Sequence, residues 1–289
     1  MEKINIGIIG YGSMGKMLFE KYADNDTDFF WDVFVANRTK EKLSDVAEEF
    51  ICGSNFTLAE KSDIIFICVR PSDLKNVLEE IKPAVSSEKI VISLNGSVSF
   101  ESINKILKCK TAKVIPSVTA EINRSQTLVC FNSLCSQKDK ETLKGVLKRI
   151  GDVIELPENE MGMGSELVSC MPGFIASIFD VLYNSAKKHT AIPENQIVEM
   201  LLKTLSATSS LMLNNKMTLE DVVKRVATKG GITEEGTAVI YNGFPSIADE
   251  LFDKTLEKRR LTWEAFNRSF SEFSEDFMAD GRKQPVNPQ

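Results

Sequence analysis

The first residues with a clear chemical use form a glycine-rich turn near the start of the chain. The segment INIGIIGYGSMG spaces Gly10, Gly12 and Gly15 as G-x-G-x-x-G, after an apolar run and before a helical pattern. In that context the motif binds the pyrophosphate of a dinucleotide at a helix N-terminus. The first glycine permits a tight turn, the second admits the phosphates, and the third lets helix and strand pack closely. A purely structural glycine turn is the alternative. The intervening residues that we include in the predicted site are Tyr11, Ser13 and Met14.

The end of the second apolar run distinguishes between the two common dinucleotides. That run, VFVA, is followed by Asn37, Arg38 and Thr39. An NAD site usually places an aspartate or glutamate here, bonded to the ribose hydroxyls. An amide, a guanidinium and a hydroxyl can instead donate to the 2′-phosphate of NADP, and the arginine can stack on adenine. We therefore predict NADP as the cofactor. An exposed arginine that only opens a helix is the alternative.

Two further loops follow apolar runs and could contact the same ligand. Val69, Arg70 and Pro71 form one of them, and Asn95 and Gly96 lie in the other. Ligands of open α/β sheets bind at the carboxyl ends of the strands, so both loops are candidates for the ribose or nicotinamide end. A plain strand-to-helix turn explains each loop equally well.

Two polar segments with glycines interrupt the second half of the chain. SCMPG contains Ser169 and Pro172, and TKGGITEEG contains Gly230, Gly231 and Thr233. A Gly-Gly pair ahead of a helix can direct backbone N–H groups at a small carboxylate. The alternative is an ordinary helix start, with Thr233 as N-cap and two glutamates in the first turn. Those glutamates would oppose a bound anion.

Composition excludes several other kinds of site. The single histidine, His189, rules out a multi-histidine metal site within one chain, and its place among lysines before a proline suggests an exposed helix end. The six cysteines form no C-x-x-C pair, which argues against zinc and thioredoxin-like sites and fits a reducing cytosol. We predict no metal and a cytoplasmic protein.

Charge and hydropathy restrict the partners. Acidic residues outnumber basic ones by 41 to 35, a formal charge of −6, which argues against nucleic-acid binding. No run reaches the roughly 18 consecutive apolar residues of a membrane span, and the N-terminus lacks a signal-peptide pattern. We therefore expect a small-molecule substrate, and neither nucleic acid nor membrane as partner.

The elements that position these residues predict an α/β fold. Apolar runs at 4–9, 33–36, 64–69, 90–94, 113–115, 127–131 and 153–155 are the expected strands. Most are apolar at consecutive positions, which is typical of a parallel sheet covered on both faces. Helical segments are expected between them at 15–24, 39–50, 71–82 and 137–150. This alternation predicts an N-terminal Rossmann-type, doubly wound sheet.

The character of the sequence changes after residue 157. Strand patterns stop, and helices are expected at 163–188, at 196–213 and after Pro245. We therefore divide the chain into an NADP-binding Rossmann domain at 1–157, an all-helical substrate and dimerisation domain at 158–280, and a tail at 281–289.

An aromatic stripe near the C-terminus suggests a subunit interface. Trp263, Phe266, Phe270, Phe273 and Phe277 are spaced 3, 4, 3 and 4 residues apart. That spacing places them on one side of a long helix. We expect part of the stripe to contact a partner subunit; packing within the same chain is the alternative.

The motifs together resemble a known family. The glycine motif, Asn-Arg-Thr, ICVRP, VIPS, CMPG and KGGITEEG occur in the order seen in pyrroline-5-carboxylate reductases, over about residues 4–275. The VIPS, CMPG and KGG forms are similar to the divergent ComER-type late-competence branch. The resemblance implies reduction of a cyclic imine to proline with NADPH or NADH, and a homodimer or larger homo-oligomer formed through the helical domain. It also implies a role in proline biosynthesis.

The resemblance further implies roles for the polar segments of the second half. Pro172, Gly230, Gly231 and Thr233 would contact the substrate, and Ser169 or Thr233 would relay a proton. A protonated cyclic imine can also bring its own proton.

One departure from the family pattern leaves alternatives open. Ile232 stands where the family has the first threonine of the substrate loop. A non-catalytic nucleotide-binding regulator of the same fold, or a reductase of another small imine or acid, therefore remain alternatives.

Overall fold

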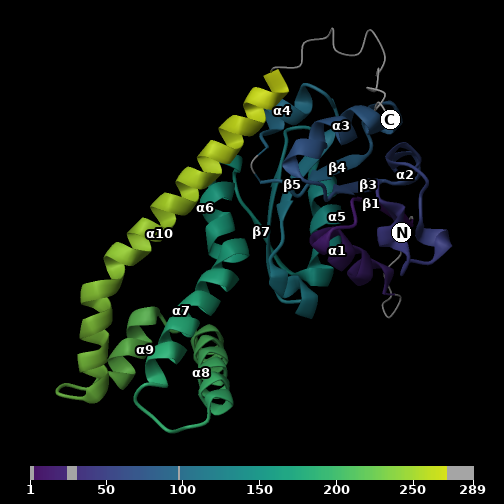
Figure 1. Ribbon diagram of the computed structural model, residues 1–289. Coiled ribbons are helices and arrows are strands. Elements are labelled where there is room, and N and C mark those ends of the chain that lie inside the picture. Colours follow the sequence, from purple (N-terminus) through teal and green to yellow (C-terminus); the bar gives the residue numbers. More distant parts are fainter. Residues whose placement is uncertain (1–2, 25–30, 97, 272–289) are drawn as a thin grey trace, which may run out of the picture. The chain divides into compact units, whose positions relative to one another are not determined.

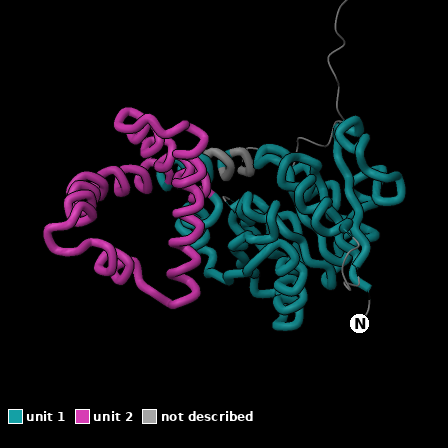
Figure 2. Tube along the Cα trace, turned by 90° about the horizontal axis from the view of Figure 1, so that it is seen from below, with its two compact units in different colours: residues 1–169, 256–289 teal, residues 170–255 magenta. Residues whose placement is uncertain are grey.

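The protein is described by a computed structural model at residues 3–24, 31–96 and 98–271, with backbone only at 265–267 and 269–271 (Figure 1). The chain forms two units, residues 1–169 with 256–289, and residues 170–255 (Figure 2). We call them the α/β unit and the helical unit. The last helix supplies residues to both.

The α/β unit is built on a seven-stranded sheet in the order β2-β1-β3-β4-β5-β6-β7. The strands are β1 (Ile4–Ile9), β2 (Trp31–Ala36), β3 (Ile64–Ile67), β4 (Ile90–Ser93), β5 (Lys110–Ile115), β6 (Ser125–Phe131) and β7 (Gly151–Glu155). Each predicted strand is present, and the Rossmann-type fold is confirmed. The pairing is parallel except between β5 and β6. That pair is antiparallel because segment 116–124 is shorter than the dozen or so residues of a parallel crossover.

Apolar side chains from alternate strand positions fill two separate layers. In β3, Ile64 and Phe66 join a buried cluster with α1 (Ser13–Ala23) and α5 (Gln137–Leu147) on one face of the sheet. Ile65 and Ile67 join a second cluster with α2 (Asn55–Lys61), α3 (Pro71–Ile81) and α4 (Phe100–Asn104) on the other face. Consecutive apolar residues are therefore needed because both faces are covered.

The helix predicted at 39–50 is wrong. The chain instead forms two 3₁₀ turns, η1 (Lys40–Leu43) and η2 (Glu48–Phe50). The amide of Cys52 donates to the Val35 carbonyl at 2.9 Å, which draws the chain back beside β2. Other short 3₁₀ turns are η3 (Lys82–Ala84), η4 (Val118–Ile122), η5 (Lys148–Ile150) and η6 (Glu158–Glu160).

Helices make up the rest of the described chain. They are α6 (Met161–Ser165), a π-helical turn (Glu166–Cys170), α7 (Met171–Ala186), α8 (Glu194–Asn215), α9 (Leu219–Val226) and α10 (Ile232–Ser271). The expectation that the last helix follows Pro245 is wrong, because α10 begins at Ile232 and contains that proline. A proline removes one backbone hydrogen bond, and this helix continues through that loss.

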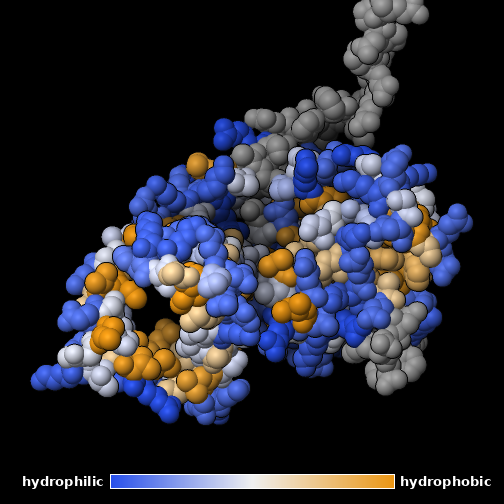
Figure 3. All heavy atoms as spheres, turned by 60° about the horizontal axis from the view of Figure 1, so that its bottom comes forward, coloured by the Kyte–Doolittle hydropathy of each residue, from blue (hydrophilic) through white to orange (hydrophobic). Residues whose placement is uncertain are grey.

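The helical unit has almost no buried core of its own. Among residues 170–255, all of which are described, only Ile197 is buried. Apolar side chains gather on the surface of its helices instead (Figure 3). Those more than half exposed are Val181, Met200, Leu202, Leu213, Leu219, Val226, Ile232, Val239, Ile240, Tyr241 and Ile247.

In the aromatic stripe only the Trp263 side chain is described, and it is 42% exposed. The side chains of Phe266, Phe270, Phe273 and Phe277 lie outside the described residues.

One stretch of helix, Glu158–Ala186, is long and apolar enough to pass a length-and-composition test for a membrane span. The sequence contains no run of 18 uninterrupted apolar residues, so our criterion did not find this stretch. One such stretch is weak support for a membrane, because a core helix of a soluble protein passes the same test.

Candidate functional site

The three glycines of the turn after β1 have different roles: two are required by the backbone geometry, and one leaves open space. Gly10 has φ +98°, and its amide donates to the Ala36 carbonyl at 2.8 Å. A Cβ at Gly15 would lie 2.0 Å from the Gly10 carbonyl oxygen, so both glycines are required by the turn itself. A Cβ at Gly12 would meet no atom within 4 Å. The backbone at Gly12 is therefore open to a ligand.

The start of α1 suits an anion. Gly12 is its N-cap residue and supplies no side-chain cap, and the first turn carries no acidic residue. Helix N-termini with free amides attract phosphate groups. The exposed Ser13 and the partly buried Met14 lie in this first turn. The turn therefore fits the pyrophosphate of a dinucleotide.

Asn37 connects the end of β2 to the glycine turn. Its Oδ1 accepts the Tyr11 amide at 2.9 Å, and its Nδ2 donates to the Thr39 carbonyl at 2.7 Å. Asn37 therefore holds the loop after β2 against the glycine turn by hydrogen bonds. The Arg38 side chain, in contrast, is 85% exposed and pairs with Asp73 at 3.3 Å. An exposed ion pair of this kind is weak, so Arg38 is available to an incoming phosphate.

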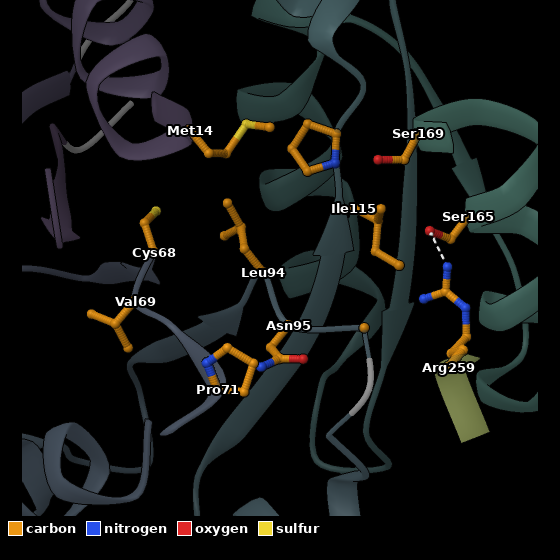
Figure 4. Close-up of a pocket in the computed structure, with 12 residues that line it drawn as sticks. Met14, Cys68, Val69, Pro71, Leu94, Asn95, Ile115, Ser165, Ser169 and Arg259 are labelled. Atoms are coloured by element: carbon orange, nitrogen blue, oxygen red, sulfur yellow. Dashed lines mark hydrogen bonds between the residues drawn. The ribbon is translucent and has the colours of Figure 1, made fainter. Parts of the chain in front are cut away.

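A pocket of about 400 Å³ lies at the carboxyl ends of β3, β4 and β5 (Figure 4). Its lining residues are Met14, Cys68, Val69, Pro71, Leu94, Asn95, Gly96, Ile115, Pro116, Ser165, Ser169 and Arg259. Met14, Cys68 and Val69 form one side of the pocket, and the polar side chains of Ser165, Ser169 and Arg259 form the opposite side (Figure 4). The pocket thus joins the glycine turn to a polar end.

The structure brings part of the predicted site together in this pocket. The predicted residues that line it are Met14, Val69, Pro71, Asn95, Gly96 and Ser169. Arg70 is the N-cap residue of α3 and is exposed outside the lining. Pro172, Gly230, Gly231 and Thr233 belong to the helical unit.

Some lining residues were missed from the sequence. Cys68 is the last residue but one of an apolar run, Leu94 ends another, and Pro116 lies in the VIPS motif, so position alone could have suggested them. Ser165 and Arg259 gave no such signal, because one lies in a glycine-rich turn of helix and the other among charged helical residues.

Comparison with known proteins settles the family. Residues 5–96 match the family described as NADP oxidoreductase, coenzyme F420-dependent, and residues 158–261 match pyrroline-5-carboxylate reductase dimerisation. Pyrroline-5-carboxylate reductase 3 of Bacillus subtilis is 31% identical over 263 residues, which are 90% of this chain and 97% of that protein. This chain belongs to the pyrroline-5-carboxylate reductase family. Members are NAD(P)-dependent oxidoreductases acting on a C=N bond.

Two further proteins are similar to this chain over most of its length. ComE operon protein 4 of Bacillus subtilis is 26% identical over 271 residues, covering 92% of this chain and 99% of that protein. Pyrroline carboxylate reductase of Plasmodium falciparum, solved with NADP bound, has the same fold at a TM-score of 0.78 and 20% identity, covering 92% of this chain and 99% of that one. The resemblance drawn from the motifs is confirmed.

Pocket chemistry in this reductase-family member is not that of a cysteine nucleophile. Burial raises the pKa of the Cys68 thiol above its usual range. A thiol in such surroundings stays protonated near neutral pH and is a poor nucleophile. His189, the only histidine, is exposed in the turn after α7. Among the described residues no cluster of histidine, cysteine and carboxylate side chains could hold a metal ion.

In the Gly-Gly segment of the helical unit, the side chain of Glu234 already accepts a hydrogen bond from the Gly230 amide. Gly230 has φ +72°, and its amide donates to the Glu234 carboxylate at 2.6 Å. The Gly231 amide donates to the Thr228 carbonyl at 2.8 Å. α10 begins at Ile232, so Thr233 is its second residue and not its N-cap. A substrate carboxylate would have to displace Glu234 to use the Gly230 amide.

Proposed function

We propose that this protein is an NADPH-dependent reductase of a cyclic imine, with pyrroline-5-carboxylate as first candidate substrate and proline as product. One observation carries the proposal: the pocket joins an open, anion-compatible glycine turn to a polar end lined by Ser165, Ser169 and Arg259. The near-full-length match to a Bacillus subtilis pyrroline-5-carboxylate reductase supports it.

Bound NADPH would supply a hydride for the imine carbon. The backbone around Gly12, at the start of α1, would bind the pyrophosphate by donating hydrogen bonds to it. The loops after β3 and β4 would flank the nicotinamide end. Apolar walls at Met14, Leu94 and Ile115 would limit water in the pocket. A protonated imine can bring its own proton, so catalysis would rest mainly on orientation.

The polar segments would complete the site. Ser169 or Thr233 would relay a proton where the imine arrives neutral. Pro172, Gly230 and Gly231 would contact the substrate. The family match that begins at residue 158 supports 158–280 as the substrate and dimerisation domain, next to an NADP-binding domain at 1–157 and a tail at 281–289.

NADP is proposed over NAD because none of residues 37–39, directly after β2, is acidic, and because Arg38 is available there. Hydrogen bonds to charged groups contribute about 1.5–3 kcal/mol. Arg38→Asp is therefore expected to weaken NADPH binding at least about tenfold and NADH binding little. Fluorescence titration with both nucleotides measures this, and equal losses would remove the basis for NADP.

We also propose a homodimer or larger homo-oligomer acting on a small molecule in the cytoplasm. The match to a dimerisation family over residues 158–261 and the exposed apolar surface of the helical unit support self-association. The free cysteines suit a reducing compartment. A formal charge of −6 disfavours nucleic acid as partner.

A second candidate function is a non-catalytic nucleotide-binding regulator. The residue that favours it is Ile232, 94% exposed where the family pattern has a threonine. Steady-state NADPH oxidation, first with pyrroline-5-carboxylate and then with other cyclic imines, separates the candidates. Turnover of pyrroline-5-carboxylate supports the reductase, and turnover of another imine alone changes the substrate. NADPH binding without any turnover would favour the regulator.

A further inference from the structure

A carboxylate reaches the neighbourhood of Arg38 from a different element of the α/β unit. Residues 37–39, directly after β2, contain no acid, but Nη1 of Arg38 donates to Oδ1 of Asp73 at 3.3 Å. Asp73 lies in the first turn of α3, which follows β3. Strands β2 and β3 pair with opposite edges of β1. The ion pair therefore joins the two segments that lie on either side of the glycine turn.

The two members of this ion pair are held very differently. The Asp73 amide donates to the Arg70 carbonyl at 3.0 Å, and the Asp73 side chain is 32% exposed. The Arg38 side chain is far more exposed, and Asp73 is its one ion-pair partner among the described residues. An acidic side chain in the first turn of a helix is stabilised by the helix dipole even without a cation beside it. Release of Arg38 therefore costs Asp73 little, and Arg38 is the member that can move.

The two nicotinamide dinucleotides would make different demands on this pair. A guanidinium can bond a carboxylate along one edge while its face stacks on an aromatic ring. Arg38 could thus stack on the adenine of NADH and keep Asp73 as its partner. The 2′-phosphate of NADPH would have to take Arg38 from Asp73, and the phosphate and the carboxylate would also repel each other.

We infer that Asp73 is a specificity-determining residue, which lowers the preference for NADPH over NADH by competing with the 2′-phosphate for Arg38. This inference rests on the proposed NADPH-dependent function and concerns the adenosine end of the cofactor. Asp73 acts through Arg38, so it is a positioning residue and takes no part in hydride transfer. The chain therefore carries both a donor for the 2′-phosphate and a carboxylate that limits its effect.

The test is fluorescence titration of wild type and Asp73→Asn with NADPH and with NADH. This substitution keeps the shape of the side chain and removes its charge. Asp73→Asn should bind NADPH at least about threefold more tightly, because a competing ion pair and a repulsion are both lost, and should bind NADH as wild type does. The gain should shrink in about 1 M salt, where screening limits charge interactions to about 3 Å.

Glu79→Gln is the matched control for the loss of one negative charge. Glu79 is an exposed acidic residue of the same helix, outside its first turn, and its replacement should leave both affinities unchanged. The double variant Arg38→Gln/Asp73→Asn shows whether Asp73 acts through Arg38. In the Arg38→Gln background, Asp73→Asn should raise NADPH affinity less than it does in wild type, because no guanidinium remains to be released.

Three results would overturn the inference. The first is an NADPH affinity that is unchanged or lower in Asp73→Asn. The second is a gain of full size in the Arg38→Gln background. The third is a shift in preference that comes from weaker NADH binding alone, since Asp73 would then hold the ribose of NADH instead of competing for Arg38.

Binding and turnover together separate this inference from the proposed function. If Asp73→Asn gains NADPH affinity as expected and wild type reduces no cyclic imine, the role of Asp73 stands and the reductase function fails. If wild type reduces pyrroline-5-carboxylate with NADPH and Asp73→Asn keeps the wild-type preference between the nucleotides, the reductase function stands and the role of Asp73 fails.

Discussion

The two units of this chain bury their apolar residues in opposite ways. The α/β unit places three buried clusters on and beside its sheet. The helical unit buries only Ile197 among residues 170–255 and leaves large apolar side chains in contact with water. An apolar surface this extensive is typical of an interaction site. We therefore expect the α/β unit to be stable by itself and the helical unit to need a partner surface.

The largest expected effect tests the self-sufficiency of the α/β unit. Phe66 is fully buried in β3, with its ring centroid 5.7 Å from that of Tyr22. Phe66→Ala should lower the free energy of unfolding by about 3–5 kcal/mol, because it leaves a cavity in a close-packed layer. Urea unfolding followed by far-UV circular dichroism measures it. The loss should be the same over a tenfold range of protein concentration; a concentration-dependent loss would show that this unit also relies on a partner.

The next effect concerns the helical unit. Val239 on α10 is 73% exposed, and burying such a side chain contributes about 1.5–3 kcal/mol. Val239→Asp should therefore weaken the proposed dimer at least about tenfold, measured by sedimentation velocity. Asn242→Asp adds the same charge at an exposed polar position of the same helix, and its dimer should be unchanged. A folded Val239→Asp protein that stays dimeric would place the interface on another face.

Sequence predicted the α/β unit better than the helical unit for a physical reason. Residues such as Ile64 and Phe66 are apolar at consecutive positions because helices cover both faces of the sheet, and that pattern is local. The helix predicted at 39–50 was wrong because a hydrogen bond between residues distant in sequence, from Cys52 to Val35, sets the path of the chain there. In the helical unit, apolar periodicity reports an interface as readily as a core, so helices were predicted but their burial was not.

The site shows the same division between local and distant information. Gly10, Gly12 and Gly15 were assigned from their spacing, because a turn and a close approach are local requirements. Arg259 lies 93 residues from Glu166 in sequence, and nothing local marks the contact. Residues brought to a pocket by tertiary packing alone cannot be identified from one sequence.

A smaller effect tests whether the helical unit also contributes to the reaction. Ile232 is 94% exposed at the start of α10, so Ile232→Thr should leave the free energy of unfolding unchanged within about 0.5 kcal/mol. A restored hydroxyl near the substrate would add one hydrogen bond, about 1 kcal/mol, and raise kcat/KM about fivefold. Initial rates of NADPH oxidation measure this. An unchanged kcat/KM would confine substrate contacts to other residues.

The smallest effect is expected at one local contact of the α/β unit. At the start of α5, the amide and Oγ of Ser136 donate to the Asp139 carboxylate at 2.8 and 2.6 Å, and Lys110 Nζ lies 3.1 Å from it. Burial opposes ionisation of Asp139, but hydrogen bonds from Ser136 and Lys110 outweigh it and hold the pKa below its usual value. Because the folded pKa is the lower one, the carboxylate stabilises the fold above the unfolded pKa, and this contribution is lost as pH falls through the folded pKa. Asp139→Asn should thus cost about 1 kcal/mol at neutral pH, and the difference from wild type should shrink as the pH falls through the lowered pKa of Asp139. Urea unfolding at neutral and at acidic pH measures it. A loss that persists in acid would show that the amide disturbs packing, and a loss that varies with protein concentration would contradict the independence of the α/β unit.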